Sequence, residues 1–149
     1  MPLDEQVAAM VSMQEEGLIG ALGLSNVAIE EYKAAKSATD VACVQNAYNL
    51  ADRSDQALLE LCAADGVPYV PFFPLGSAFH PDKPVLTSPA VIDTAKRLGA
   101  TPAQVALAWL LQRSSNLLLI PGTSSLAHLR ENLAAAVLEL DAQAMSEIG

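Results

Sequence analysis

The chain has 149 residues, a length that suits one domain, and it carries a formal net charge of −9. This acidic balance argues against nucleic acid and against an anionic membrane surface as general partners, because both select basic surfaces. No run of 18 apolar residues occurs in the sequence, so no membrane-spanning helix is expected.

The composition is unusually apolar for a domain of this size. Hydrophobic residues make up 52% of the chain and charged residues only 17%, against about a quarter in an average soluble domain. Either the interior is unusually large, or part of the surface faces another protein.

The cysteines and the N-terminal segment indicate a compartment. Cys43 and Cys62 form no CxxC pair, and we expect both to be buried free thiols. The first ten residues are acidic and amphipathic, with no basic region before an apolar one, so they do not have the pattern of a secretory signal. A cytoplasmic location is therefore expected.

Helical and strand patterns alternate along the chain. A first helix is predicted over residues 4–16, where apolar residues recur at helical spacing and Gly17 can end the helix. Short apolar runs predict strands over residues 18–24, 40–48, 67–73 and 117–121. Further helices are predicted over residues 27–36, 54–64, 91–98, the apolar segment after a capping box at Thr101–Gln104, 124–137, and a short segment after Asp141.

This order predicts parallel βαβ units, with apolar strands covered by helices on both faces. Four strands suit either a small open α/β sandwich or half of a (β/α)8 barrel, since a closed barrel needs about 250 residues. Residues 74–89, with four prolines, form the longest irregular stretch and are long enough to suggest function.

Familiar catalytic motifs are not found. The two histidines, His80 and His128, lack neighbouring ligands at metal spacing, so we expect no metal site. The sequence contains no GxSxG, GxxxxGK[ST] or GxGxxG.

Small, polar or Pro/Gly-rich residues follow each predicted strand, and ligands of parallel α/β proteins bind at these strand ends. In the segment GTSS, Thr123, Ser124 and Ser125 place hydroxyls beside the free N–H groups of a helix N-terminus, where an anion is favoured. Gly122 allows close backbone approach to a ligand. The alternative is that Ser124 or Ser125 only caps the helix.

Five segments in order resemble the aldo/keto reductase family, the last two its bacterial branch in particular: GLSNV, VQNAYNLADR, PFFPLG, GATPAQVALAWLLQR and IPGTSSLAHLRENLAA. The resemblance runs through residues 1–149 and covers only the second half of the family's barrel. It implies a single domain, a parallel (βα)4 half of a TIM (β/α)8 barrel. It also implies an NAD(P)H-dependent oxidoreductase acting on aldehydes and ketones, with NADP as cofactor and NAD as an alternative.

The resemblance assigns the cofactor-binding residues. Ser25, Asn26 and Gln45 would contact the nicotinamide amide, and Phe72 would stack on its ring. Phe73 stands where relatives have a serine. Gly122 and His128 stand where many relatives have a lysine and an arginine, and Glu131 and Asn132 would lie near the adenine. The implied set is Ser25, Asn26, Gln45, Phe72, Pro74, Leu75, Gly76, Gly122, Thr123, Ser124, Ser125, His128, Glu131 and Asn132.

The family's catalytic tyrosine, lysine, aspartate and histidine belong to the first half of the barrel, so no catalytic residue is assigned here. We expect this chain to be a truncated or split product, inactive alone, that uses a small carbonyl substrate only when an N-terminal half completes it. The alternatives are a non-catalytic nucleotide-binding or interaction remnant and a rearranged open sheet. Exposed strand edges predict self-association or a partner chain.

Overall fold

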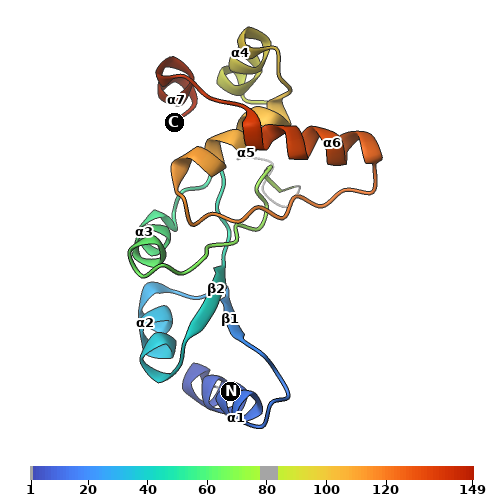
Figure 1. The fold of residues 1–149 in the computed structure, drawn as a ribbon. Coiled ribbons are helices and arrows are strands. Elements are labelled where there is room, and N and C mark those ends of the chain that lie inside the picture. The colour runs from blue at the N-terminus through green and yellow to red at the C-terminus, as the bar shows by residue number, and fades with distance from the viewer. Residues whose placement is uncertain (1, 78–83) are drawn as a thin grey trace.

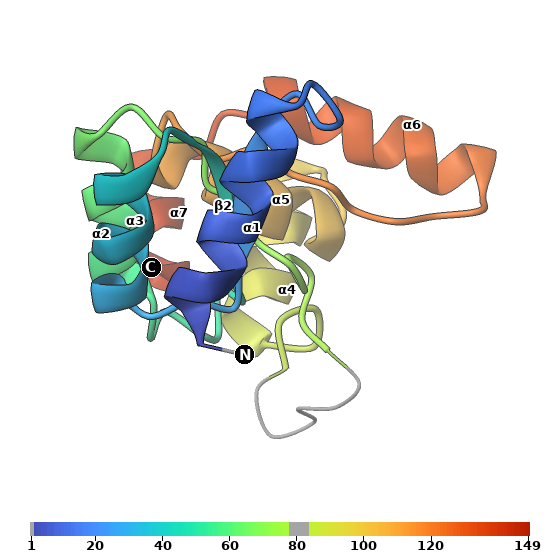
Figure 2. The same cartoon turned by 90° about the horizontal axis from the view of Figure 1, so that it is seen from below.

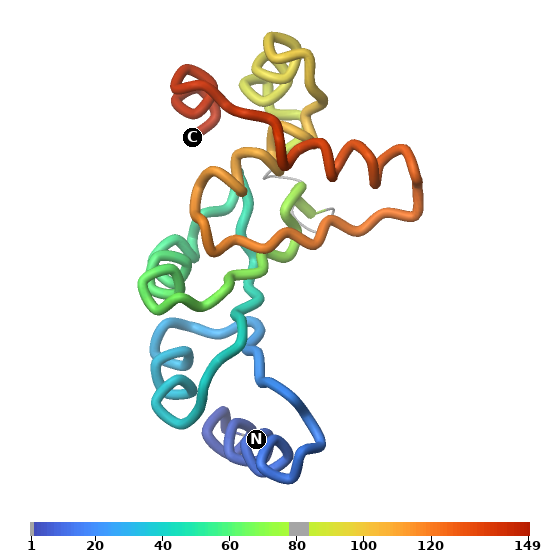
Figure 3. The backbone as a smooth tube through the Cα atoms, viewed as in Figure 1, coloured from blue at the N-terminus to red at the C-terminus, as the bar shows by residue number. Residues whose placement is uncertain are grey.

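Helices and short strands alternate along the whole chain in the computed structural model, which describes residues 2–77 and 84–149. The first elements are α1 (Leu3–Glu15), β1 (Leu22–Ser25), α2 (Ile29–Ala38), β2 (Val41–Gln45) and α3 (Gln56–Ala64). The others are α4 (Pro89–Leu98), α5 (Pro102–Arg113), α6 (Leu126–Ala134), a 3-10 turn (Ala135–Val137) and α7 (Ala142–Ile148). The two termini lie at opposite ends of this succession of elements (Figure 1, Figure 3).

The sheet is parallel, as predicted, but only its first two strands are regular. β1 and β2 pair from Leu22 opposite Val41 to Ser25 opposite Gln45. The third predicted strand joins β2 through bridges at Tyr69 and Phe72, and the fourth joins the third through one bridge between Tyr69 and Leu117. Four parallel strand segments therefore pair in the expected order, but the third and fourth join through isolated bridges rather than a continuous ladder.

Two prolines explain why the third segment forms no regular ladder. Tyr69 bonds toward the fourth segment, since its N–H donates to the Asn116 carbonyl and its carbonyl accepts from the Leu118 N–H. The Val70 N–H donates to the Val44 carbonyl on the opposite side. Pro68 and Pro71 alternate with these residues and carry no N–H, so one donor is lost on each side.

The helices cover one face of the strands (Figure 1). Leu22 and Leu24 of β1 are buried, whereas Gly23 and Ser25, which alternate with them, are exposed. The expectation that both faces would be covered was wrong for this part of the sheet, because the alternate positions carry small residues that no helix packs upon. An α/β layer with one open face is the result.

Local signals set several helix ends where the sequence predicted them. Gly17 and Gly99 adopt positive φ angles of 74° and 64° directly after α1 and α4. At the start of α5, the Thr101 hydroxyl accepts from the Gln104 N–H and the Gln104 side chain accepts from the Thr101 N–H. The predicted capping box is thus confirmed, and residues 105–110 of α5 are all buried, as expected.

Trp109 of α5 lies at the centre of the core and is 1% exposed. Its ring stacks on Tyr48 with ring centroids 6.2 Å apart, and the Arg53 guanidinium lies 4.6 Å from its centroid. Arg53 also donates to the carbonyls of Leu50 and Ile148, so α7 is tied to the loop after β2. This cluster joins the loop after β2 to the buried helix α5 and to the C-terminal helix α7.

Asp141 connects α7 to α4. Its carboxylate caps α7 by accepting from the Ala144 N–H and receives two bonds from the Arg97 guanidinium, the shorter 2.6 Å. These donors lower the pKa of Asp141 to about 2.

A depressed carboxyl pKa stabilises the fold above the ordinary value near 4, and this contribution is lost as the pH falls toward 2. We therefore expect Asp141→Asn, which still offers a capping oxygen, to lower the melting temperature at pH 7. The difference from the parent chain should shrink steadily between pH 4 and pH 2. A difference that stays constant in thermal unfolding across this range would contradict the linkage.

The cysteines differ from the expectation in one respect. Both are free, and Cys62 is fully buried, as expected, but Cys43 is only half-buried because it lies on the open face of β2. His80 and part of the predicted functional loop at 74–89 lie outside the described residues. Within the described ranges, no helix is long and apolar enough to cross a membrane.

Candidate functional site

Three of the predicted strand-end segments meet at one edge of the sheet. The Asn26 N–H donates to the Gln45 carbonyl at 3.1 Å, and the Phe72 N–H donates to the Asn46 carbonyl at 3.0 Å. Beside them lies a hollow of about 240 Å³, lined by Asn26, Ala47, Asn49, Asp52, Phe72, Phe73 and Ser77. The structure therefore brings together the carboxyl ends of the first three strand segments, where the sequence placed a ligand.

The side chains at this edge are free to meet a ligand. Ser25 and Asn26 are exposed and Gln45 is half-buried. Within the described part of the chain, the Ser25 hydroxyl and the carboxamides of Asn26 and Gln45 have no hydrogen-bond partner. An amide group of a ligand could use these donors and acceptors at once.

Asn46 is buried beneath this edge, and its carboxamide bonds fix the chain after β1. Its Oδ1 accepts from the Val27 N–H at 3.1 Å, and its Nδ2 donates to the Val27 carbonyl at 2.7 Å. The same Nδ2 donates to the Asp55 carboxylate at 2.8 Å. The Asn46 side chain thus pairs with the backbone of Val27 as a neighbouring strand would. Since Val27 follows Asn26, these bonds keep Asn26 against Gln45.

None of the three tyrosines is placed as a proton donor at the site. Tyr32, Tyr48 and Tyr69 are each 0% exposed, and their hydroxyls donate to Asp65, Gln56 and Asp55. Burial, together with these acidic acceptors, raises the pKa of Tyr32 and of Tyr69 above the ordinary value. These phenols serve the packing between strands and helices.

Phe72 and Phe73 form an apolar wall of the hollow. Their rings meet edge to face with centroids 5.1 Å apart. Phe73 has a φ of 56° and Asn26 a φ of 58°, and they are the non-glycine residues with positive φ among those described. Asparagine adopts this region readily, whereas an aromatic residue is strained in it, and backbone strain concentrates at functional sites. Both residues line the same hollow.

The segment at 122–125 makes the local bonds of a helix start. Ser125 caps α6 by accepting from the His128 N–H at 3.4 Å, and the Thr123 hydroxyl accepts from the Ser125 N–H at 3.1 Å. Gly122, Thr123 and Ser124 are exposed. The capping interpretation is confirmed for Ser125. The exposed residues Gly122, Thr123 and Ser124 are still accessible to an anion.

The remaining predicted site residues lie on α6 and in the loop after Phe73. Glu131 is engaged with α5, since its carboxylate accepts from the Thr101 hydroxyl and its carbonyl from the Gln104 side chain at 3.3 Å. His128 is exposed and Asn132 half-buried on α6. Pro74, Leu75 and Gly76 continue from Phe73 as half-buried loop residues. None of the predicted residues from 122 to 132 lines the hollow itself.

Two buried asparagines of the site were missed by the sequence assignments. The sequence assigned no role to Asn46 or to Asn49, although both stand in the segment VQNAYNLADR. Both are buried, and both bond to backbone of other strand-end loops, at Val27 and at Phe73.

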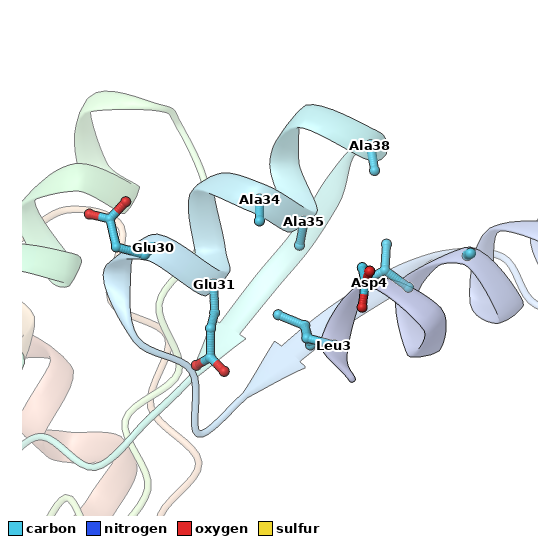
Figure 4. A pocket seen from close by; sticks show the side chains of 9 residues that line it. Leu3, Asp4, Glu30, Glu31, Ala34, Ala35 and Ala38 are labelled. Carbon is cyan, nitrogen blue, oxygen red and sulfur yellow. The ribbon is translucent and has the colours of Figure 1, made fainter. Parts of the chain in front are cut away.

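A second hollow, of about 370 Å³, lies between α1 and α2 (Figure 4). Its wall is largely apolar, with Leu3, Ala34, Ala35 and Ala38, while Asp4, Glu30 and Glu31 lie at its rim. Glu31 is already engaged, because its carboxylate accepts from the Ala28 N–H at 2.7 Å. No group of three His, Cys, Asp or Glu side chains suited to a metal occurs among residues 2–77 and 84–149.

Parallel βα units with a candidate site at the carboxyl strand ends define a parallel α/β protein, either an open sheet or part of a barrel. The family model described as the aldo/keto reductase family matches residues 1–149, and the chain belongs to this family. The fold expected from the sequence, a parallel α/β part of a TIM barrel, is confirmed.

Individual relatives support the same assignment. The chain is 50% identical over 146 residues to pyridoxine 4-dehydrogenase of Escherichia coli, covering 98% of this chain and 49% of that protein. An uncharacterized oxidoreductase of Schizosaccharomyces pombe is 37% identical over 99% of this chain and 47% of its own length. The chain therefore spans about half the length of the curated relatives it matches.

Solved structures agree with the sequence relatives. An aldo/keto reductase from Klebsiella pneumoniae in complex with NADP and acetate superposes with a TM-score of 0.87 at 30% identity, covering 99% of this chain and 53% of that one. The thermostable aldo-keto reductase Tm1743, solved with the inhibitor epalrestat, gives a TM-score of 0.83 at 33% identity, covering 99% of this chain and 54% of that one.

Proposed function

We propose that this chain is the cofactor-binding half of a nicotinamide-dependent carbonyl reductase. The observation that supports this most strongly is the convergence of Ser25, Asn26, Gln45 and Phe72 at one edge of a parallel sheet. Among the described residues, the side-chain polar groups of Ser25, Asn26 and Gln45 have no partner, and the chain belongs to a family whose relatives are solved with NADP and NADPH.

The residues present suit this cofactor. Ser25, Asn26 and Gln45 would hold the nicotinamide carboxamide, and Phe72 would stack on its ring. The turn Gly122–Ser125 would take a phosphate, with its hydroxyls and the start of α6 as donors. Glu131 and Asn132, beside His128, would lie near the adenine. The cofactor, when bound, supplies the hydride.

The choice between NADP and NAD depends on charge near the adenosine. We propose NADP, in line with the Klebsiella pneumoniae relative, and keep NAD as the alternative because Gly122 and His128 bring no fixed positive charge to this region.

We further propose that the chain alone reduces carbonyl compounds poorly. A reductase must deliver a proton to the carbonyl oxygen as hydride arrives. The buried phenols of Tyr32, Tyr48 and Tyr69 all point to partners away from the hollow. A small carbonyl substrate would need residues supplied by another segment, and without them the chain would serve as a nucleotide-binding or interaction module.

Calorimetric titration with NADPH tests the cofactor site. We expect measurable binding to the parent chain, and about tenfold weaker binding for Gln45→Ala, because the carboxamide bonds of one amide are lost. Gln143→Ala is the matched control, since Gln143 lies on α7 and bonds only to Glu147 among the described residues. Absence of any heat at millimolar NADPH would overturn the proposal.

The exposed apolar residues support a covering partner, either a second copy or another chain. Leu126, Leu129, Leu133 and Val137 are exposed along α6 and the turn after it, which extends away from the other helices (Figure 2). Leu118 and Ile120 are exposed on the last strand segment, where the sheet has an open edge.

Sedimentation velocity would test this surface. We expect the parent chain to sediment as a dimer or larger, and Leu133→Glu to shift it toward monomer. Ala127→Glu, with the same added charge on another side of α6, should change little. A parent chain that stays monomeric at high micromolar concentration would contradict self-association and would leave a different chain as the partner.

The cytoplasmic location stays a prediction that depends on the two free cysteines.

A further inference from the structure

The backbone of Phe73 adopts a conformation that an aromatic residue rarely takes. Its φ of 56° lies in the left-handed region, where the Cβ atom crowds the backbone. The strained residue directly follows Phe72, and both rings form the wall of the hollow at the strand ends. Some contact must hold this backbone in place, because the intrinsic preference opposes it.

Asn49 provides such a contact. Its side chain is buried, and its Nδ2 donates to the Phe73 carbonyl at 3.1 Å. The same carbonyl accepts from the Gly76 N–H at 2.9 Å, which closes a turn after Phe73. The Asn49 amide therefore ties the strained residue to the loop after β2, 24 positions earlier in the chain.

The two ends of the Asn49 carboxamide do separate work. Its Oδ1 accepts from the N–H groups of Ala51 and Asp52, each at 2.9 Å, and this organises the loop of Asn49 itself. Only the Nδ2 reaches across to Phe73. A substitution that keeps the oxygen and removes the nitrogen would therefore release Phe73 and leave the Asn49 turn intact.

We propose that Asn49 is a positioning residue of the nicotinamide site, which sets the Phe72 ring by fixing the carbonyl of Phe73. The inference rests on the proposed cofactor function and adds a residue to it. Asn49 lines the same hollow as Asn26 and Phe72, so the effect of the tether falls on the wall where the nicotinamide ring would lie. The adenosine half of the cofactor, at the start of α6, would not depend on it.

Asn49→Asp separates the two roles. The carboxylate still accepts from Ala51 and Asp52, while the donor to Phe73 is lost and an oxygen faces the Phe73 carbonyl instead. Asn116→Asp is a matched control, because the Asn116 side chain bonds to Val67, at the end of the third strand segment opposite to Phe73. Its Nδ2 donates to the Val67 carbonyl at 3.0 Å and its Oδ1 accepts from the Ser114 hydroxyl.

Binding of NADPH and of 2′,5′-ADP, which has no nicotinamide, would be measured for the parent and both variants, with melting temperatures alongside. We expect Asn49→Asp to weaken NADPH five- to tenfold, to shift the NADPH fluorescence of the complex, and to leave 2′,5′-ADP within twofold. Asn116→Asp should lower the melting temperature without changing either affinity.

Equal losses for both ligands, or unchanged NADPH binding in Asn49→Asp, would overturn the positioning role. If the parent chain binds neither ligand, the proposed cofactor function itself has failed, which is a different result from a parent that binds and a variant that binds equally well.

Discussion

Trp109→Ala is expected to destabilise the chain by about 3–5 kcal/mol, as found for large aromatic residues removed from protein cores. The Trp109 side chain is 1% exposed, stacks on Tyr48 and lies under the Arg53 guanidinium. A small alanine would leave a cavity in α5 and remove the surface that orients Arg53. Since Arg53 donates to the Ile148 carbonyl, α7 would lose its tether as well.

Urea unfolding followed by far-ultraviolet circular dichroism would measure this loss, because the chain contains one tryptophan and the variant loses its fluorescence. Trp109→Phe is the matched control. It keeps an apolar ring against Tyr48, so we expect it to recover more than half of the lost stability. A loss below about 1 kcal/mol for the alanine variant would show that the core does not depend on this cluster.

The helices were predictable from the sequence because their signals are local. Gly17 and Gly99 end helices by adopting positive φ, and Thr101 with Gln104 starts one, and all of these act within a few residues. The third and fourth strand segments were harder, since regular pairing depends on which side of the strand Pro68 and Pro71 face. The apolar character of β1 likewise did not reveal that its face with Gly23 and Ser25 stays open.

Some residues of the candidate site were likewise predictable from the sequence, and others were not. Ser25, Asn26, Gln45 and Phe72 stand in motifs that resemble the family, and the structure brings their segments to one edge. The roles of Asn46 and Asn49 were not predicted, because their partners, Val27 and Phe73, are 19 and 24 residues away along the chain. Such contacts exist only once the strands are side by side, so no spacing in the sequence announces them.

Asn46→Ala is expected to lower the free energy of unfolding by about 3 kcal/mol and also to weaken NADPH binding. The variant leaves the N–H and carbonyl of Val27 without their partner, and it removes one donor from the Asp55 carboxylate. Each buried polar group left unpaired costs about 1–3 kcal/mol. Asn26 directly precedes Val27, so the loss of these bonds would also loosen Asn26 from Gln45. Asn26 and Gln45, both proposed to hold the nicotinamide, would then move apart.

Urea unfolding and NADPH titration on the same samples would check this. Asn116→Ala is the control, because it removes the bonds to the Val67 carbonyl and the Ser114 hydroxyl away from the site and should leave NADPH binding unchanged.

Asn46→Asp adds a test by pH. It keeps the oxygen that accepts from Val27 but sets a second carboxyl against Asp55, and two adjacent carboxyls raise the pKa of one of them. The ionised pair destabilises the fold at neutral pH, and a proton shared between them restores a donor. The stability deficit of Asn46→Asp should therefore shrink as the pH falls from 7 to 5, whereas that of Asn46→Ala should stay constant over this range. Parallel behaviour of the two variants would contradict a coupling between position 46 and the Asp55 carboxyl.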